Sequence, residues 1–184
     1  ARLFDMLIGD WDRHQDQWRW IEFKENGKKV YRPLPRDRDQ VFSNYDGALL
    51  RVVTRLLPTI RKMQTYKSEI RNLRWHNTNG RPVDMKLIRS LTKEDWLEQA
   101  RFIKENLTDE VIEKAFSQFP EPVQNKNVVN AKAVLKQRRN LVEKIASDLR
   151  LFTLCSFVCK KCIGTNSIIS IAQPFSLFPI SEIH

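Results

Sequence analysis

Two short acidic segments contain the side chains of this chain that are best suited to chemistry. Residues 10–18 have the sequence Asp-Trp-Asp-Arg-His-Gln-Asp-Gln-Trp, and residues 35–40 have the sequence Pro-Arg-Asp-Arg-Asp-Gln. Carboxylates that two loops bring close together repel each other unless a cation or a proton lies between them. The two segments therefore predict a metal site, a catalytic site or both.

The residues of the two segments also suit phosphoryl transfer from a nucleotide. That reaction needs a carboxylate to accept the proton of the attacking hydroxyl, oxygen ligands for Mg²⁺, and positive charge against the transferring group. Asp12, Gln17 and Asp37 would supply the carboxylate and the oxygen ligands, in the order used by protein-kinase-like folds.

Both segments resemble motifs of atypical kinases. Asp12-Arg13-His14-Gln15-Asp16-Gln17 resembles the Asp-Arg-His-Asn-x-Asn catalytic loop of phosphoinositide-type lipid kinases, and is similar to the Asp-Arg-His loops of secretory-pathway kinases and HipA-type toxin kinases. Residues 35–42 are similar to the Pro-x-Asp-x-Asp-x-x-Phe metal-binding segment of CotH-type kinases. Both motifs lie within residues 3–47. The chain also resembles a kinase-like module of large Bacteroidetes surface proteins, which would place it at the bacterial cell envelope or outside the cytoplasm.

The resemblance implies a role for each matching residue of the first segment. Asp12 takes the position of the catalytic base. Arg13 and His14 would shape the loop and contact phosphate. The expected activity is that of a phosphotransferase acting on a nucleotide and a phosphate acceptor of unspecified class.

The resemblance also implies a site for Mg²⁺ or Mn²⁺. Gln17 occupies the position of the family's metal-binding Asn, and Asp37 aligns with the metal-binding Asp that precedes the activation segment. Asp39 is a second candidate ligand. Gln17 departs from the family pattern, because glutamine offers the same carbonyl ligand on a side chain that is one methylene longer. Asp16 could take over its role.

The nucleotide cradle is a larger departure from the family. A kinase engages ATP with a Gly-rich loop and a Lys that lie before the catalytic loop. This chain has five glycines and no Gly-rich loop. We therefore expect residues 1–150 to be a kinase C-lobe fragment that lacks the N-lobe, and that transfers no phosphate without other domains of a longer protein.

Two other functions remain open at this stage. A non-catalytic kinase-like module of a multidomain bacterial surface protein would explain the replacement of Asn by Gln17. A metal-dependent phosphohydrolase would also use clustered aspartates. Such hydrolases usually recruit histidine ligands, and the chain has only three histidines, which disfavours this alternative.

Composition indicates a folded, basic chain. Hydrophobic residues make up 41% of the 184 residues and charged residues 29%. The net charge of +10 favours anionic partners. The cations between Arg51 and Arg89 are interleaved with few aromatic side chains, a pattern that favours a solvated helix face over a specific nucleic-acid surface.

Local patterns predict an α+β fold that is mostly helical. Residues 2–8 would end a buried helix at Gly9, and residues 18–34 would form a β-hairpin around the Asn-Gly pair at 26–27. Pro33 and Pro35 should end the strand pairing.

Helices should fill most of residues 47–150. An apolar stripe from Leu49 to Ile60 predicts the first, with Pro58 kinking or ending it, and residues 64–90 look irregular, with a loop at 77–82. Thr92 with Asp95 predicts a capping box for a helix to about Asn106. One further helix should begin at Thr108, and another should span residues 128–146.

The last part of the chain differs in composition from the rest. Residues 151–184 hold three charged side chains, Lys160, Lys161 and Glu182, among Ile, Ser and Phe residues without a clear period. Lys160, Lys161 and Asn166 interrupt the apolar sequence, so no transmembrane helix is expected. An out-of-frame translation after a break in the coding sequence, a genuine extension and a membrane-associated segment are the alternatives.

Overall fold

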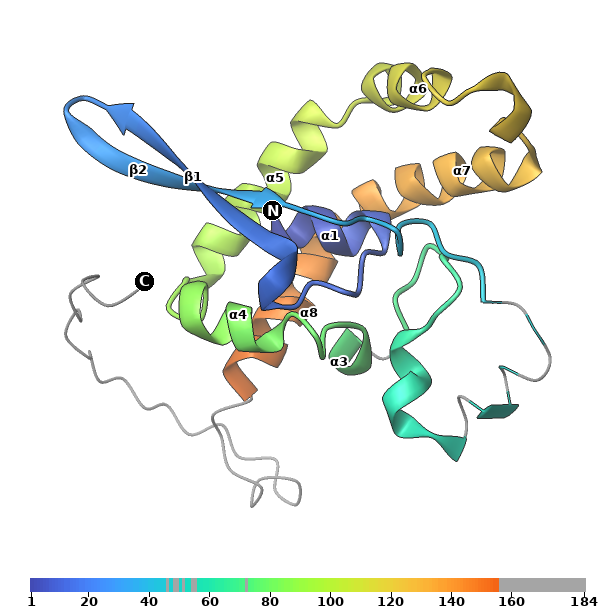
Figure 1. The fold of residues 1–184 in the computed structure, drawn as a ribbon, viewed down its shortest axis with the longest axis horizontal. Helices are drawn as coiled ribbons and strands as arrows, with labels where there is room; N and C mark the ends of the chain where they lie inside the picture. The colour runs from blue at the N-terminus through green and yellow to red at the C-terminus, as the bar shows by residue number, and fades with distance from the viewer. Residues whose placement is uncertain (46, 48–49, 51, 54–55, 72, 156–184) are drawn as a thin grey trace.

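The structure is a computed structural model that describes residues 1–45, 47, 50, 52–53, 56–71 and 73–155. Within these residues the chain forms seven α-helices and one two-stranded antiparallel hairpin, which confirms the predicted α+β class. The hairpin projects away from the helices, and α1 (Arg2–Ile8) lies among them (Figure 1).

Helix α1 is the predicted helix end before the first acidic segment. Its Met6 and Leu7 side chains are fully buried. Gly9 ends the helix with a φ of +78°, in the left-handed region. A Cβ atom at Gly9 would lie 2.8 Å from Cδ2 of Tyr66. The position therefore requires glycine both for its backbone conformation and for the close approach of the tyrosine ring.

Strands β1 (Trp18–Glu25) and β2 (Lys28–Pro35) form the predicted hairpin. Asn26 and Gly27 adopt φ angles of +51° and +75°. Two consecutive positive φ angles are typical of the type I′ turn that the Asn-Gly pair predicts.

Of the two prolines predicted to end the strand pairing, Pro35 is the last paired residue, whereas the prediction was wrong for Pro33, where pairing continues. Pro33 is paired with Trp20, and Pro35 with Trp18. Prolines two positions apart direct their nitrogens to the same edge of a strand, and a two-stranded sheet leaves one edge of each strand unpaired. Proline is therefore compatible with this strand.

The middle of the chain contains more helix than its sequence predicts. Part of the apolar stripe from Leu49 to Ile60 lies outside the described residues; Pro58 begins the 3-10 helix η2 (Pro58–Lys62). Helices α3 (Leu73–His76) and α4 (Arg81–Leu87) occupy segments predicted as irregular or loop. Pro82, predicted as loop, lies in the first turn of α4, where a backbone N–H would have no partner within the helix.

The next two helices begin at their predicted caps. In α5 (Lys93–Asn106), the Thr92 hydroxyl accepts from the Asp95 backbone N–H, and the Asp95 carboxylate accepts from the Thr92 N–H. In α6 (Asp109–Ser117), the Thr108 hydroxyl accepts from the backbone N–H of Val111. These bonds use N–H groups that have no partner within the helix.

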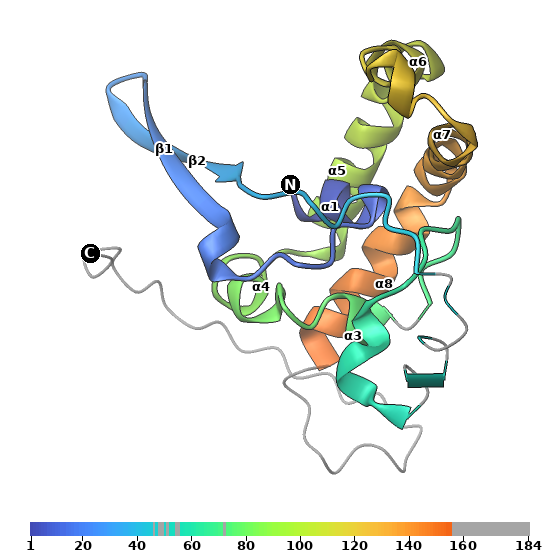
Figure 2. The ribbon, with the colours of Figure 1, turned by 45° about the vertical axis from the view of Figure 1, so that its right-hand side comes forward.

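The single helix predicted over residues 128–146 is two helices. α7 (Lys126–Asn140) and α8 (Val142–Cys155) meet at Leu141. The chain bends there, so that α8 lies alongside α5 while α7 lies next to α6 (Figure 2). The apolar pattern continues through Leu141 and does not predict the break, at which the main packing partner changes from α6 for α7 to α5 for α8. Helix α8 also extends to residue 155, into the segment that composition sets apart from residue 151 onward.

One hydrophobic core joins α1 to the later helices. Tyr66, with α1, α5, α6, α7 and α8, contributes the fully and nearly fully buried side chains of this core: Leu3, Met6, Leu7, Ile8, Tyr66, Trp96, Ala100, Ile112, Phe116, Ala131, Val134, Leu135, Val142, Ile145, Ala146 and Leu149. Helix α1 is thereby fixed at the centre, and the first acidic segment starts from its end. No helix among the described residues has the length and apolarity needed to cross a membrane.

Candidate functional site

The end of α1 is anchored by side chains from distant parts of the chain. Arg138 Nη1 donates to the Met6 carbonyl oxygen over 2.6 Å, and Tyr66 Oη donates to the Leu7 carbonyl oxygen over 2.6 Å. The Arg138 guanidinium also lies 4.2 Å from the centroid of the Tyr66 ring. A cation at a helix C-terminus is favourable, because carbonyl groups carry the negative end of the helix dipole there. These contacts fix the point from which the first acidic segment leaves the helix.

Beside this anchor lies a group of paired charges, which we call the ion cluster. Arg2 pairs with Asp84 (2.6 Å) and with Asp5 (3.0 Å), and Arg38 pairs with Asp5 (3.0 Å). Asp5 and Asp84 are fully buried. Buried charges require such partners, because burial alone disfavours ionisation. The full cluster is Arg2, Asp5, Asp10, Arg13, Arg38 and Asp84.

Asp10 and Arg38 were noted in the sequence as parts of the acidic segments, and both belong to the ion cluster. The Asp10 carboxylate lies 3.4 Å from Arg13 Nη1 and 3.3 Å from Arg38 Nη1. Burial raises the pKa of Asp10 to about 6, while the Arg13 and Arg38 guanidinium groups oppose that rise. Asp10 thus serves the internal charge balance of the fold.

Arg13 joins the two acidic segments. Its side chain is 0% exposed and lies 4.6 Å from the ring centroid of Trp18. Nη2 donates to the carbonyl oxygen of Gln17 over 2.9 Å, and Nη1 donates to the carbonyl oxygens of Arg36 (2.6 Å) and Asp37 (3.0 Å). One guanidinium therefore holds the backbone of both loops, and its burial keeps it away from any solvent-exposed ligand.

The contacts of Arg13 bring two of the candidate metal ligands together. Gln17 Nε2 lies 3.4 Å from Asp37 Oδ2. The Arg36 backbone N–H also donates to the Gln17 carbonyl oxygen over 2.8 Å. Asp37 has a φ of +40°, in a region that aspartate tolerates better than most residues. The segments therefore do converge at this point.

The catalytic-base candidate Asp12 lies at the edge of the protein, with its side chain 27% exposed. His14 Nε2 lies 4.0 Å from Asp12 Oδ2, and His14 Nδ1 lies 3.7 Å from Asp16 Oδ2. Asp16 is the most open of these side chains, at 88% exposed. His14 consequently stands between the two carboxylates.

Asp39 belongs to neither of these two groups of candidates. Its carboxylate accepts a hydrogen bond from Gln40 Nε2 over 2.9 Å, and within the described residues it makes no hydrogen bond or ion pair with the other candidates. The structure thus groups the candidates as Asp12 with His14 and Asp16, and Gln17 with Asp37, leaving Asp39 apart.

Sequence reasoning missed two residues that contact this site. Asn79 Nδ2 donates to Asp12 Oδ1, and Lys62 Nζ donates to Asn79 Oδ1 over 3.1 Å. Lys62 also lies 4.8 Å from the ring centroid of Trp11. An asparagine in an Asn-x-Asn-Gly turn is a weak local signal for a polar contact. Nothing in the local sequence marks Lys62.

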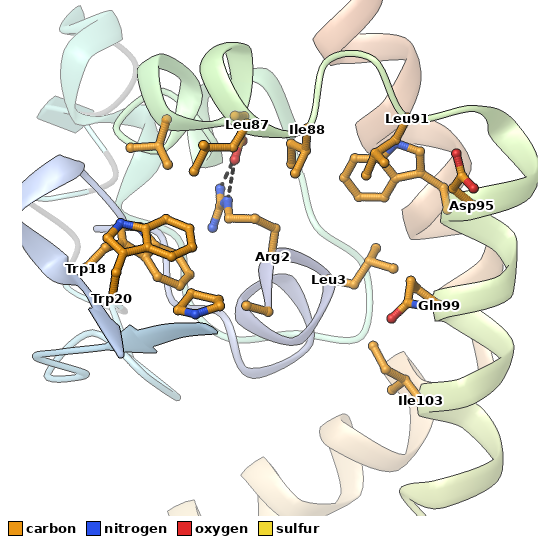
Figure 3. A pocket seen from close by; sticks show the side chains of 15 residues that line it. Arg2, Leu3, Trp18, Trp20, Leu87, Ile88, Leu91, Asp95, Gln99 and Ile103 are labelled. Atoms are coloured by element: carbon orange, nitrogen blue, oxygen red, sulfur yellow. Dashed lines mark hydrogen bonds and ion pairs between the residues drawn. The ribbon is translucent and has the colours of Figure 1, made fainter. Parts of the chain in front are cut away.

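A separate hollow of about 380 Å³ lies between the hairpin and the helices, beside Arg2 and Asp84 of the ion cluster (Figure 3). Arg2, Trp18, Trp20, Leu87 and Ile103 are among its lining residues, which come from α1, the hairpin, α4 and α5. Arg2 is already paired with Asp84 at its wall. The hollow contains none of the seven candidate site residues, so it is a distinct feature.

The donor set of the acidic segments is made of oxygens. Within the described part of the chain, no three His, Cys, Asp or Glu side chains are gathered as a metal-binding group. Asp37 Oδ2 faces Nε2 of the Gln17 amide, so the amide would have to present its oxygen instead before both side chains could be ligands. Mg²⁺ commonly takes only one or two protein carboxylates, with phosphate oxygens and water completing its coordination. One carboxylate and one amide oxygen are therefore a donor set that suits a divalent cation whose other ligands come from outside the chain. Comparisons with protein-family models, curated proteins and solved structures give no match to this chain.

Proposed function

We propose that this chain is the catalytic-loop half of an atypical-kinase-like phosphotransferase, acting together with a nucleotide-binding lobe in a longer protein. The observation that carries the proposal is the set of hydrogen bonds from the Arg13 guanidinium to backbone carbonyl oxygens of both acidic segments. They hold the first segment against the second, so that Gln17 lies beside Asp37 while Asp12 stays accessible. The kinase motifs require that same separation of roles between a base and a metal-binding pair.

In this proposal Asp12 is the general base. The hydroxyl oxygen of the acceptor attacks the terminal phosphorus of ATP, the bond from phosphorus to the bridging oxygen breaks, and ADP leaves. The acceptor's proton passes to the Asp12 carboxylate, which is 27% exposed and can therefore meet a substrate. His14, beside Asp12 Oδ2, would contact the acceptor or the phosphate.

Gln17 and Asp37 would hold Mg²⁺ or Mn²⁺, with Asp16 and Asp39 as further ligands. The bound cation would offset negative charge on the nucleotide's phosphate oxygens. Arg13 is a positioning residue in this scheme, because its burial prevents contact with substrate.

Binding of Mn²⁺ tests the metal half of the proposal on the 184-residue chain. Water-proton relaxation should detect one Mn²⁺ site, strengthened by ATP. Asp37→Asn should weaken that site at least about tenfold, since it removes a charged ligand. Asp148→Asn is the matched control, because Asp148 pairs with Lys144 on the surface of α8. Equal Mn²⁺ affinity in both variants would contradict the assignment of Asp37.

Phosphate transfer tests the catalytic half in the longest native product that contains this chain. With radiolabelled ATP, Asp12→Asn should lower turnover by about a hundredfold or more, which is the usual contribution of a general base. If Asp12→Asn turns over substrate as fast as the Asp148→Asn control, Asp12 is not the general base. Nucleotide binding without any transfer would instead support a non-catalytic kinase-like module.

A further inference from the structure

The turn at residues 77–80 is held in place by buried polar contacts. Asn77 is fully buried, and its Nδ2 donates to Asp84 Oδ2 over 2.8 Å. Arg2 Nη2 donates to Asn77 Oδ1, and Arg2 also packs against Gly80, where a Cβ atom would overlap Nη2. The ion cluster thus fixes this turn, and with it the position of Asn79.

Asn79 carries the turn's contact to the first acidic segment. Its amide N–H donates to Asp12 Oδ1, and its amide oxygen accepts from Lys62 Nζ. The amide dipole is therefore aligned between a cation and a carboxylate. Of the two carboxylate oxygens of Asp12, Asn79 engages only Oδ1.

We propose that Asn79 and Lys62 are positioning residues for Asp12, the base of the proposed phosphotransfer on which this inference rests. Asn79 fixes the carboxylate through Oδ1, so that Oδ2, which lies 4.0 Å from His14 Nε2, is the oxygen that would take the acceptor's proton. Lys62 polarises the Asn79 amide and keeps positive charge next to the base. Residues from the η2 and α3–α4 segments, far along the chain from Asp12, thereby complete the catalytic loop.

The contact itself is tested without activity, on the 184-residue chain. The side-chain amide resonance of Asn79, assigned by its loss in Asn79→Leu, should shift in nitrogen–proton correlation spectra when Asp12→Ala is introduced. It should shift again with Lys62→Met. The matched control is Lys86→Met, at an exposed position of α4. If the Asn79 resonance keeps its chemical shift in both Asp12→Ala and Lys62→Met, the proposal is overturned.

The positioning role is tested by kinetics in the longer native product. Asn79→Leu should lower kcat about tenfold to a hundredfold, the effect of losing a charge-assisted hydrogen bond, with the nucleotide KM within about twofold of wild type. Asn130→Leu, at an exposed position of α7, should leave both constants unchanged. A fall in kcat no larger than that of Asn130→Leu would refute the role of Asn79.

The pH profile separates positioning from a merely structural effect. Asn79→Asp puts a like charge beside the base, so the acid limb of the kcat profile should move to higher pH. Lys62→Met should move it in the same direction, because a cation is lost. His14 also faces Asp12, so both shifts are measured in a His14→Gln background as well. An unmoved acid limb in both variants would refute the proposal even if Asn79→Leu failed to fold.

Failure of this inference is distinguishable from failure of the proposed function. If Asp12→Asn leaves turnover intact, the phosphotransferase assignment falls. If Asp12→Asn abolishes turnover while the Asn79 and Lys62 variants behave as wild type, only the positioning role falls.

Discussion

Replacing Arg13 with Met would test whether one buried guanidinium holds the two acidic segments together. Methionine is of similar length and can keep the apolar contact with Trp18, but it has no charge and no donor. The substitution removes the three bonds to the carbonyl oxygens of Gln17, Arg36 and Asp37. It also removes the pairing of Arg13 with Asp5 (3.7 Å) and with Asp10 (3.4 Å).

The expected cost follows from the charge that remains. In the ion cluster three arginines oppose three aspartates, so Arg13→Met leaves one negative charge without compensation. Removing one partner of a buried ion pair typically costs about 3–5 kcal/mol. We therefore expect a loss of about that size in the free energy of unfolding at about pH 7, a large part of the total for an ordinary domain.

Acid should relieve part of this loss. Burial already raises the pKa of Asp10 to about 6, and Arg13 opposes that rise. Without Arg13, the Asp10 carboxyl takes up its proton at a higher pH than in the wild type. The proton restores neutrality, so the cost of Arg13→Met should shrink by roughly 1–2 kcal/mol between about pH 7 and about pH 5.

Urea unfolding followed by circular dichroism at both pH values would measure these changes. Arg32→Met is the matched control, because the Arg32 side chain is 60% exposed, pairs with Glu25 on the surface of the hairpin and should contribute no more than about 1 kcal/mol. A loss for Arg13→Met no larger than that of the control, or one identical at both pH values, would refute the reasoning.

Two further predictions concern stability. Gly9→Ala should lower the free energy of unfolding by about 1–3 kcal/mol more than Gly27→Ala. Both residues have a positive φ, but only a Cβ at Gly9 meets Tyr66. Equal losses in chemical denaturation would exclude a steric cost from the Tyr66 contact. Burial, with Arg138 and Arg2 nearby, lowers the pKa of His76 to about 3 from an ordinary 6.5, so the folded state resists protonation and loses stability as pH falls below about 6.5. Relative to His76→Gln, the wild type should lose about 2.5 kcal/mol between about pH 7 and about pH 4.5, and parallel stability curves would contradict this expectation.

Local sequence signals predicted several elements closely, because they depend on neighbouring residues alone. Gly9 ends α1, Asn26 and Gly27 form the hairpin turn, and Thr92 caps α5 through Asp95. Each feature is a short-range match between a side chain and a backbone conformation. The break at Leu141 has no such signal, and it coincides with the change of main packing partner from α6 for α7 to α5 for α8.

The residue types of the candidate site could be predicted from the sequence, but not which of those residues contact one another and which are buried. The spacing of the acidic segments placed Asp12, Gln17 and Asp37 in one region, and the structure pairs Gln17 with Asp37. Asp10 has the same residue type as Asp12 and Asp37 and lies in the same segment as Asp12. Its burial beside Arg13 and Arg38 makes it part of the ion cluster, a fact that depends on where α1 and the second segment meet.

The sequence by itself determined the two acidic segments, the hairpin between them and the main helix caps, since these follow from contacts within a few residues. The tertiary structure alone decided that Arg13 is buried between the segments and that Asn79 and Lys62 reach Asp12 from a distant turn. Hydrogen bonds and ion pairs act only over a few ångströms. Which partners come within that range is set by the packing of α1 and its core neighbours.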